Sequence, residues 1–191
     1  MRYRHKGFTL IELLVTVSIA SLLTLIAVPS LITFQRNSEL TSVANKFVTS
    51  VNAARGEALK RGMGAVVVPL NNGANWNLGW AAFVDKARNQ TYNPAAEGTV
   101  AVQQAVPAGI TVTGNGTAAA AVPYIMFDAS GYSRTKAGGF GALAFSIQRN
   151  DVAAADLPEQ SRFIIISSTG RVRVCKPLSS SDASCNALST Q

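Results

Sequence analysis

An apolar segment near the N-terminus, residues 8–28, constrains the fold of this chain more than any other feature. Its roughly 21 residues would form an α-helix about 30 Å long, which matches the hydrocarbon core of a membrane. The serine and threonine hydroxyls within it can hydrogen-bond to carbonyl groups of the same helix. Arg2, Arg4 and Lys6 precede it without any acidic residue, and such a basic flank stays on the cytoplasmic side. We therefore expect one membrane-spanning helix, with the rest of the chain outside the cytoplasm.

Glu12 is the only charged residue of that segment. A charged acid inside a membrane costs roughly 2.5–3.5 kcal/mol, so we expect Glu12 to lie near the interface, to be protonated or to be paired. A secretory signal peptide is cleaved after its apolar segment, whereas the candidate cleavage point here, between Gly7 and Phe8, lies before it. Cleavage there would leave a free α-amine on Phe8. Glu12 could then neutralise the α-amine of a neighbouring subunit in an assembly.

The string Gly7-Phe8-Thr9-Leu10-Ile11-Glu12 resembles the prepilin signature that type IV pilins share with type II secretion pseudopilins. The resemblance implies that residues 1–7 are a leader removed by a prepilin peptidase and that Phe8 is N-methylated. It also implies that Glu12 acts when the subunit enters a helical filament. The expected location is the bacterial inner membrane, with a periplasmic head, followed by incorporation into a pilus or pseudopilus. The alternative is a plain membrane anchor that begins with Gly-Phe by chance.

Charge and composition argue against an enzyme. The formal net charge of +7 falls to +4 when Arg2, Arg4 and Lys6 leave with the leader. The only histidine, His5, is also in the leader, which excludes His-dependent triads and a His-ligated metal from the mature chain. The acidic residues beyond the helix are scattered through turn-like contexts, and no paired carboxylates stand out. We expect no enzymatic activity, no cofactor and no metal.

Residues 29–61 predict an amphipathic continuation of the first helix. Pro29 should kink the helix rather than end it, because an apolar periodicity of three and four residues resumes beyond it. The members of this apolar stripe are Leu40, Val43, Phe47, Val51, Ala54 and Ala58. Gly62 and Gly64 mark its end. We expect one helix from Phe8 to about Arg61, whose second half packs on a globular head.

Residues 62–191 predict a β-rich head. Short runs rich in β-branched and aromatic residues alternate there with Gly, Asn and Pro. The expected strands are residues 65–68, 80–84, 99–106, 110–113, 124–127, 142–147, 163–167 and 171–175, and the expected loops are residues 71–78, 114–121 and 179–191. We expect mainly antiparallel sheets with the helix on one face, which is an α+β fold.

The head carries a second resemblance. The string from Asn75 to Asp85, which contains Trp76 and Trp80, is similar to the head signature of the FimT and GspH family of minor type IV pilins and minor type II pseudopilins. Residues 127–131 (Phe-Asp-Ala-Ser-Gly) fit the same pattern, as do residues 168–171 (Ser-Thr-Gly-Arg). The resemblance implies a pilin-like fold. For the two tryptophans we favour packing in the core under a turn over stacking on a ligand.

Residues 163–174 predict a β-hairpin with a glycine at its turn. Because side chains alternate between the faces of a strand, Val172 and Val174 can enter the core while Arg171 and Arg173 project together. The Cα atoms of the two arginines would lie about 6.6–6.8 Å apart. This spacing is close to that of successive phosphates on a nucleic-acid strand, and guanidinium groups bind phosphate in bidentate fashion.

Arg162 opens the first strand of this hairpin and Lys176 follows the second, so four cations lie within 15 residues that contain no acid. Such a patch would bind double-stranded DNA through its phosphates, with little sequence preference and strong salt dependence. Arg134 and Lys136 could extend it. Gly170-Arg171-Val172-Arg173 also resembles the Gly-Arg-x-Arg motif of FimT-type pilins, which implies a part in DNA uptake during natural transformation. Alternatively, the arginines guard an exposed strand against aggregation or form a solvated face.

Cys175 and Cys185 lie ten positions apart, in a segment that the leader places outside the cytoplasm. A disulfide is the natural interpretation there. By restricting the unfolded chain it would stabilise the fold by ~3 kcal/mol and brace the loop after the basic hairpin. Two free thiols or a shared metal are the alternatives.

The leading hypothesis is a FimT-like minor pilin whose head binds DNA. The alternative is a protein-binding subunit, either a GspH-like pseudopilin of type II secretion or a minor pilin that acts only in pilus assembly. Both would have other pilins or pseudopilins and a prepilin peptidase as partners, so the basic hairpin is the feature that distinguishes them.

Overall fold

The computed structural model describes residues 7–70 and 73–186, apart from the side chains of Ile26 and Pro29. The chain divides into two compact units, residues 1–38 and residues 39–191. Each unit is described by itself.

Helix α1 (Leu10–Arg61) runs through Pro29 without interruption, as the sequence predicts. In the first unit its apolar side chains are exposed, and the helix is long and apolar enough to cross a membrane. Its hydroxyls bond to carbonyl groups one turn back, for example Ser18 to Leu14 at 2.8 Å and Ser21 to Val17 at 2.8 Å. These hydroxyl groups therefore find their hydrogen-bond acceptors within the helix itself.

In the second unit, α1 buries one stripe of side chains against the sheets. All six residues of the predicted stripe are buried, namely Leu40, Val43, Phe47, Val51, Ala54 and Ala58. The helix ends at Arg61, and Gly62 follows with φ of +63°, the left-handed conformation that glycine adopts at helix ends. The buried Arg149 guanidinium fixes the start of this stretch, because it pairs with Glu39 at 2.8 Å and with Asp151 at 2.7 Å.

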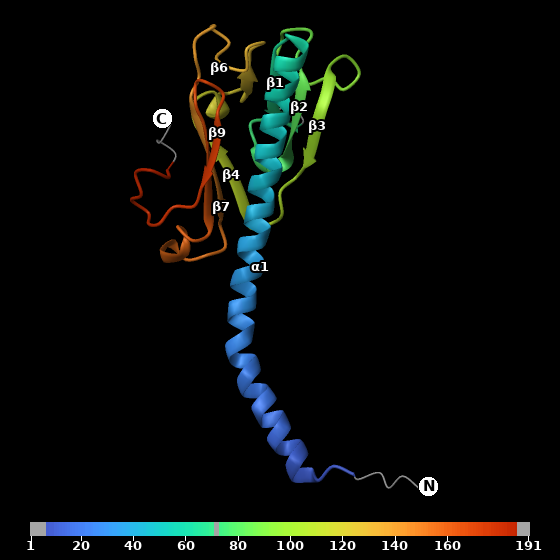
Figure 1. The fold of residues 1–191 in the computed structure, drawn as a ribbon, viewed down its shortest axis with the longest axis vertical. Helices are drawn as coiled ribbons and strands as arrows, with labels where there is room; N and C mark the ends of the chain where they lie inside the picture. The colour runs from blue at the N-terminus through green and yellow to red at the C-terminus, as the bar shows by residue number, and fades with distance from the viewer. Residues whose placement is uncertain (1–6, 71–72, 187–191) are drawn as a thin grey trace. The chain divides into compact units, whose positions relative to one another are not determined.

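The strands form two antiparallel sheets (Figure 1). The first has the order β3-β2-β1-β5-β6 and consists of β1 (Ala65–Pro69), β2 (Gly79–Val84), β3 (Gly98–Gln104), β5 (Ile125–Phe127) and β6 (Ser133–Arg134). The second has the order β4-β7-β8-β9 and consists of β4 (Ile110–Gly114), β7 (Leu143–Arg149), β8 (Ser161–Ile166) and β9 (Val172–Cys175). The predicted antiparallel α+β architecture is confirmed. Strand β6 was not predicted, because two residues give no periodic signal.

An aromatic cluster joins the helix to both sheets. The Phe47 ring lies 5.9 Å from Trp76, 4.9 Å from Trp80 and 4.5 Å from Phe145, measured between ring centroids. Trp76 also donates its indole N–H to the Ala118 carbonyl at 2.9 Å. Both tryptophans are buried, so their interpretation as core residues is confirmed.

Replacement of Phe47 by alanine should therefore destabilise the head by about 3–5 kcal/mol, because it removes the ring on which both sheets pack. Thermal unfolding of the full-length protein in non-ionic detergent, followed by the fluorescence of the two buried tryptophans, measures this. Lys46→Ala, an exposed change at the neighbouring position of the same helix, is the control. Equal melting temperatures for the two variants would contradict the assigned core.

Candidate nucleic-acid interface

Strands β8 and β9 form the predicted hairpin, with Ile166 opposite Val172. Its turn is closed by two hydrogen bonds, from the Gly170 N–H to the Ser167 carbonyl at 2.9 Å and from the Ser167 N–H to the Arg171 carbonyl at 3.0 Å. Gly170 has φ of +78°, a conformation that side chains with a Cβ rarely adopt. The glycine turn is thus confirmed, with Arg171 in the turn rather than in the strand.

Arg171 and Arg173 line one hollow of about 320 Å³, together with Ile165, Ser167 and Thr169. Arg171 is exposed, and among the described residues its guanidinium has no hydrogen-bond partner. The Ser167 and Thr169 hydroxyls lie 2.8 Å apart at the same place. Guanidinium and hydroxyl groups both donate hydrogen bonds, so this hollow has the chemistry of an anion site.

Only one of the two valines of β9 packs as predicted. Val172 packs against the main core, but Val174 is 40% exposed. Strand β9 is the edge of its sheet, and the core cluster reaches it only at the turn-proximal end. The expectation that Val174 enters the core is therefore wrong.

Arg162 does not join the other arginines of the hairpin. It shares a strand face with Ile164 and Ile166, which belong to the core, so it points to the helix side of the sheet. Its guanidinium donates to the Thr41 hydroxyl at 3.3 Å and to the Ser161 carbonyl at 2.7 Å. Burial lowers the pKa of Arg162 from its ordinary value. We therefore correct the expected patch by removing Arg162 from the face that carries the hollow.

The expected lysines are also engaged. Lys176 lies 3.9 Å from the Glu159 carboxylate, in an exposed ion pair of the kind that stabilises by at most about 1 kcal/mol. Lys136 lies over the Tyr124 ring, 4.8 Å from its centroid. Lys176 therefore stays near the hairpin but has an acid, Glu159, beside it. Glu159 lies just outside the 15-residue window that contains no acid.

Cys175 and Cys185 form the predicted disulfide, with their Cα atoms 5.8 Å apart, which excludes free thiols and a shared metal. The loop that it closes positions Arg173, whose guanidinium donates to the Ser184 carbonyl at 3.1 Å. Asp182 organises this loop by accepting the Ser184 N–H at 2.9 Å, and hydrogen bonds from Ser184 hold the Asp182 pKa below its ordinary value. Within residues 7–70 and 73–186, no three His, Cys, Asp or Glu side chains could hold a metal ion.

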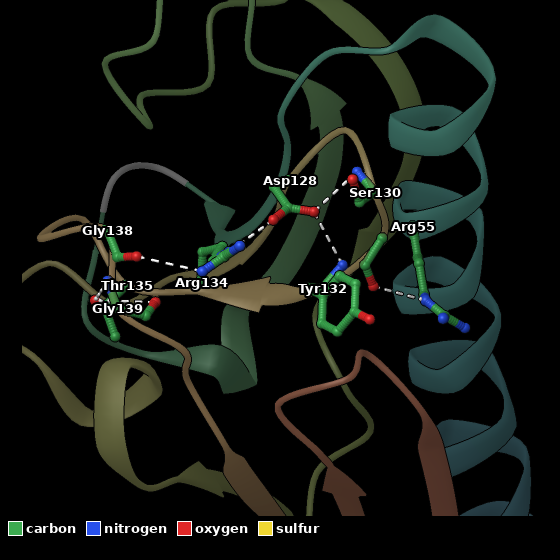
Figure 2. Close-up of polar contacts among 9 residues, drawn as sticks. Arg55, Asp128, Ser130, Tyr132, Arg134, Thr135, Gly138 and Gly139 are labelled. Carbon is green, nitrogen blue, oxygen red and sulfur yellow. Dashed lines mark hydrogen bonds and ion pairs between the residues drawn. The ribbon is translucent and has the colours of Figure 1, made fainter.

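The turn before Arg171 is clamped to the helix and to the other sheet. Arg55, on α1, donates to the Gly131 carbonyl at 2.9 Å and to the Thr169 carbonyl at 3.2 Å, and Figure 2 shows the first of these bonds. A Cβ on Gly170 would overlap the Gly131 carbonyl oxygen. A Cβ on Gly131 would lie 3.1 Å from Leu59. The two turns therefore meet because Gly170 has no side chain, and the absence of a side chain at Gly131 lets that turn lie against Leu59 of the helix.

The second of these turns has its own polar network (Figure 2). Asp128 accepts hydrogen bonds from the Ser130 N–H at 2.9 Å, the Tyr132 N–H at 3.0 Å and the Arg134 guanidinium at 2.6 Å. Burial would raise the pKa of Asp128, but these hydrogen bonds, led by that of Arg134, lower it overall. The Arg134 guanidinium also lies 4.0 Å from the Phe140 ring centroid. The Asp-x-Ser spacing is a turn signal that predicts the hydrogen bond from the Ser130 N–H to Asp128. No signal in the sequence predicts that Arg134 packs on Phe140.

Gly7 and Phe8 precede helix α1, and Glu12 lies in its first turn. Gly7 and Phe8 are exposed and non-helical, and Phe8 is 88% exposed. The Glu12 carboxylate accepts the Thr9 N–H and the Thr9 hydroxyl, each at 3.0 Å, and the Glu12 N–H donates to the Thr9 hydroxyl at 3.2 Å. This is a capping box, which the Thr-x-x-Glu spacing could have revealed. The pairing of Glu12 with a neighbour's α-amine stays a prediction.

Comparison with known proteins places these features in a family. A family profile described as "Type II transport protein GspH" matches residues 43–170, and one described as "Prokaryotic N-terminal methylation motif" matches residues 2–28. Because the first match covers more than half of the chain, the chain belongs to the GspH family. It is a type IV pilin-like minor pilin of the GspH/FimT type, which confirms the prepilin leader and the family resemblance. Such a subunit is anchored by its N-terminal helix and assembles with other pilins after processing by a prepilin peptidase.

One solved structure supports the fold. The type IV minor pilin FimU of Pseudomonas aeruginosa (strain PAO1), in space group P21, matches with a TM-score of 0.54 at 19% identity, over 76% of this chain and 98% of FimU. Its P65 crystal form gives a TM-score of 0.44 at 18% identity, over 76% and 97%. A search of curated proteins finds no match. The first structural match shows a pilin fold.

Replacement of Gly170 by alanine tests the contact between the two turns. It should destabilise the head by at least about 2 kcal/mol, because a Cβ must both adopt a left-handed conformation and displace the Gly131 carbonyl. Gly138→Ala is a matched control, since Gly138 has φ of +85° and open space around a Cβ, and should lose only about 1–2 kcal/mol. Thermal unfolding of both variants gives the comparison. Equal losses would mean that the turns do not meet closely.

Proposed function

We propose that this minor pilin binds double-stranded DNA non-specifically through Arg171 and Arg173 and takes part in DNA uptake for natural transformation. The observation that carries the proposal is the shared hollow, which Arg171 and Arg173 line together with Ser167 and Thr169. Donors of this kind bind phosphate oxygens and carry no sequence information. Lys176 would add charge nearby, whereas Arg162 faces the helix and would not contact DNA directly.

Rigidity of the hairpin supports this proposal. The disulfide loop holds Arg173 through the Ser184 carbonyl, and the Arg55 clamp holds the turn that precedes Arg171. An arginine has five N–H donors, so the bond from Arg173 to Ser184 leaves most of them for a phosphate. Side chains held in place before binding lose less conformational freedom when the ligand arrives.

In this proposal the subunit is made with a leader that a prepilin peptidase removes after Gly7. The mature Phe8 is N-methylated, and the helix is held in the inner membrane with a periplasmic head. Glu12 assists entry into the filament by pairing with the α-amine of a neighbour. The head then presents the hairpin to DNA without any covalent chemistry, and the pilus motor supplies the work of retraction.

A second candidate function is that of a GspH-like pseudopilin of type II secretion, or of a minor pilin that acts only in assembly. The match of residues 43–170 to the GspH profile favours this alternative as much as the first. Deletion of the gene in the source bacterium separates the two. Loss of transformation with intact secretion and piliation favours DNA uptake. Loss of secretion favours the pseudopilin, and loss of piliation favours a role in assembly.

The double variant Arg171→Gln, Arg173→Gln tests DNA binding. It should bind duplex DNA more weakly at every sequence, and the slope of log affinity against log salt should become shallower by about 2, since two phosphate contacts are lost. Titrations of the full-length protein in non-ionic detergent, at low and at physiological salt, measure both quantities. Transformation should fall while piliation persists.

The control for these titrations is Lys46→Gln, Lys60→Gln, which removes the same charge from exposed positions of α1. If the two double variants bind duplex DNA equally well, the arginines act only through net charge and the proposed site is wrong.

A further inference from the structure

Two aromatic side chains lie exposed beside the basic hairpin. Tyr132 is 40% exposed and Phe140 is 59% exposed, and their ring centroids are 5.7 Å apart in an edge-to-face arrangement. Neither ring belongs to the hydrophobic core clusters. Large exposed rings in contact with each other are a feature of binding surfaces, because their burial against a partner releases much apolar surface from water.

Arg134 holds this pair in place. Its guanidinium lies 4.0 Å from the Phe140 centroid and 6.0 Å from the Tyr132 centroid. The same guanidinium is fixed by Asp128 at 2.6 Å, as Figure 2 shows. The cation is therefore already neutralised and packed against the rings, and the pair of rings keeps its position without a ligand.

The pair adjoins the turn that carries Arg171. The Ser133 N–H, next to Tyr132, donates to the Ser168 carbonyl at 3.0 Å. Gly131, on the other side of Tyr132, contacts Gly170. Since consecutive Cα atoms are about 3.8 Å apart, the Cα atoms of Tyr132 and Arg171 are separated by about 14 Å at most. A nucleic-acid strand bound at Arg171 could thus reach the aromatic pair within a few nucleotides.

We propose that Tyr132 and Phe140 form a stacking surface for unpaired DNA bases, next to the arginines that bind the phosphates. Aromatic rings beside a basic groove are how proteins bind single strands, because every base has a face that can stack. This inference rests on the proposed DNA binding and extends it to the ligand class, single-stranded segments. A duplex keeps its bases stacked inside, so it would use the arginines alone.

The test compares two probes on the full-length protein in non-ionic detergent. One is a 12-nucleotide oligo-dT that contains a single 2-aminopurine, whose fluorescence falls when it stacks, and the other is a relaxed, closed circular duplex. The double variant Tyr132→Ala, Phe140→Ala should bind the oligonucleotide about 5-fold to 100-fold more weakly and lose the 2-aminopurine quenching. Its affinity for the circular duplex and its salt slope should not change, because no phosphate contact is removed. The ring-preserving variant Tyr132→Phe, Phe140→Tyr should behave as the wild type.

The outcomes separate this inference from the proposed function. Unchanged oligonucleotide binding by the alanine variant overturns the stacking surface, and so does an equal loss for both probes. Duplex binding that survives Arg171→Gln, Arg173→Gln overturns the phosphate site, while a loss confined to the oligonucleotide in the alanine variant still supports stacking. Unchanged DNA affinities together with reduced piliation would identify the aromatic pair as a contact with another pilin, and would overturn its role in DNA binding.

Discussion

The contact between two glycine turns is the constraint on which the basic hairpin depends. Gly131 lies in a turn of one sheet and Gly170 in a turn of the other, and Gly170 approaches the Gly131 carbonyl closely because it carries no Cβ. The absence of a Cβ on Gly131 likewise lets its turn lie against Leu59 of the helix. Arg55 reaches from the helix to carbonyl groups of both turns. The Arg55 side chain and the backbone of the Gly131 turn thus fix the position of the residues immediately before Arg171. The match to the GspH profile ends at Gly170, so the turn belongs to the family fold and the arginines follow directly after it.

Anchoring and binding are separate in this chain. The first unit contains the apolar part of α1, whose hydroxyls and capping box satisfy its polar groups locally. The second unit contains the hairpin, whose far end is held by the Cys175–Cys185 loop through Ser184. The capping box and the Ser18 hydrogen bond of the first unit do not involve residues of the hairpin. Changes to the hairpin should therefore leave membrane insertion and processing intact.

The sequence predicts the features that arise from local periodicity and composition. The helical stripe from Leu40 to Ala58, the disulfide and eight of the nine strands in residues 7–70 and 73–186 all follow from spacing and residue type. Alternation correctly predicts that Arg171, in the turn, and Arg173, in β9, lie at the same place, since both line one hollow. Its failure at Val174 arises because alternation says which face a residue is on, while burial there depends on how far the core extends along an edge strand.

Contacts between distant segments could not be predicted in this way. The position of Arg162 depends on Thr41 of the helix, and the packing of Arg134 depends on Phe140. The Arg55 clamp joins residues 76 and 114 positions apart, so no window of the sequence contains it. The Thr9–Glu12 capping box and the Asp128–Ser130 turn both had recognisable local motifs that sequence reasoning passed over.

If the Arg55 clamp holds the basic hairpin in the position that binds DNA, the duplex DNA affinity of Arg55→Gln is the most direct test. Arg55 already donates to two carbonyl groups, so its replacement removes a support of the turn as well as one charge. Lys60→Gln removes the same charge from an exposed position one to two turns further along the helix. Arg55→Gln should bind duplex DNA more weakly than Lys60→Gln does, at a temperature where tryptophan fluorescence shows both variants to be folded. Equal affinities for the two variants would contradict it.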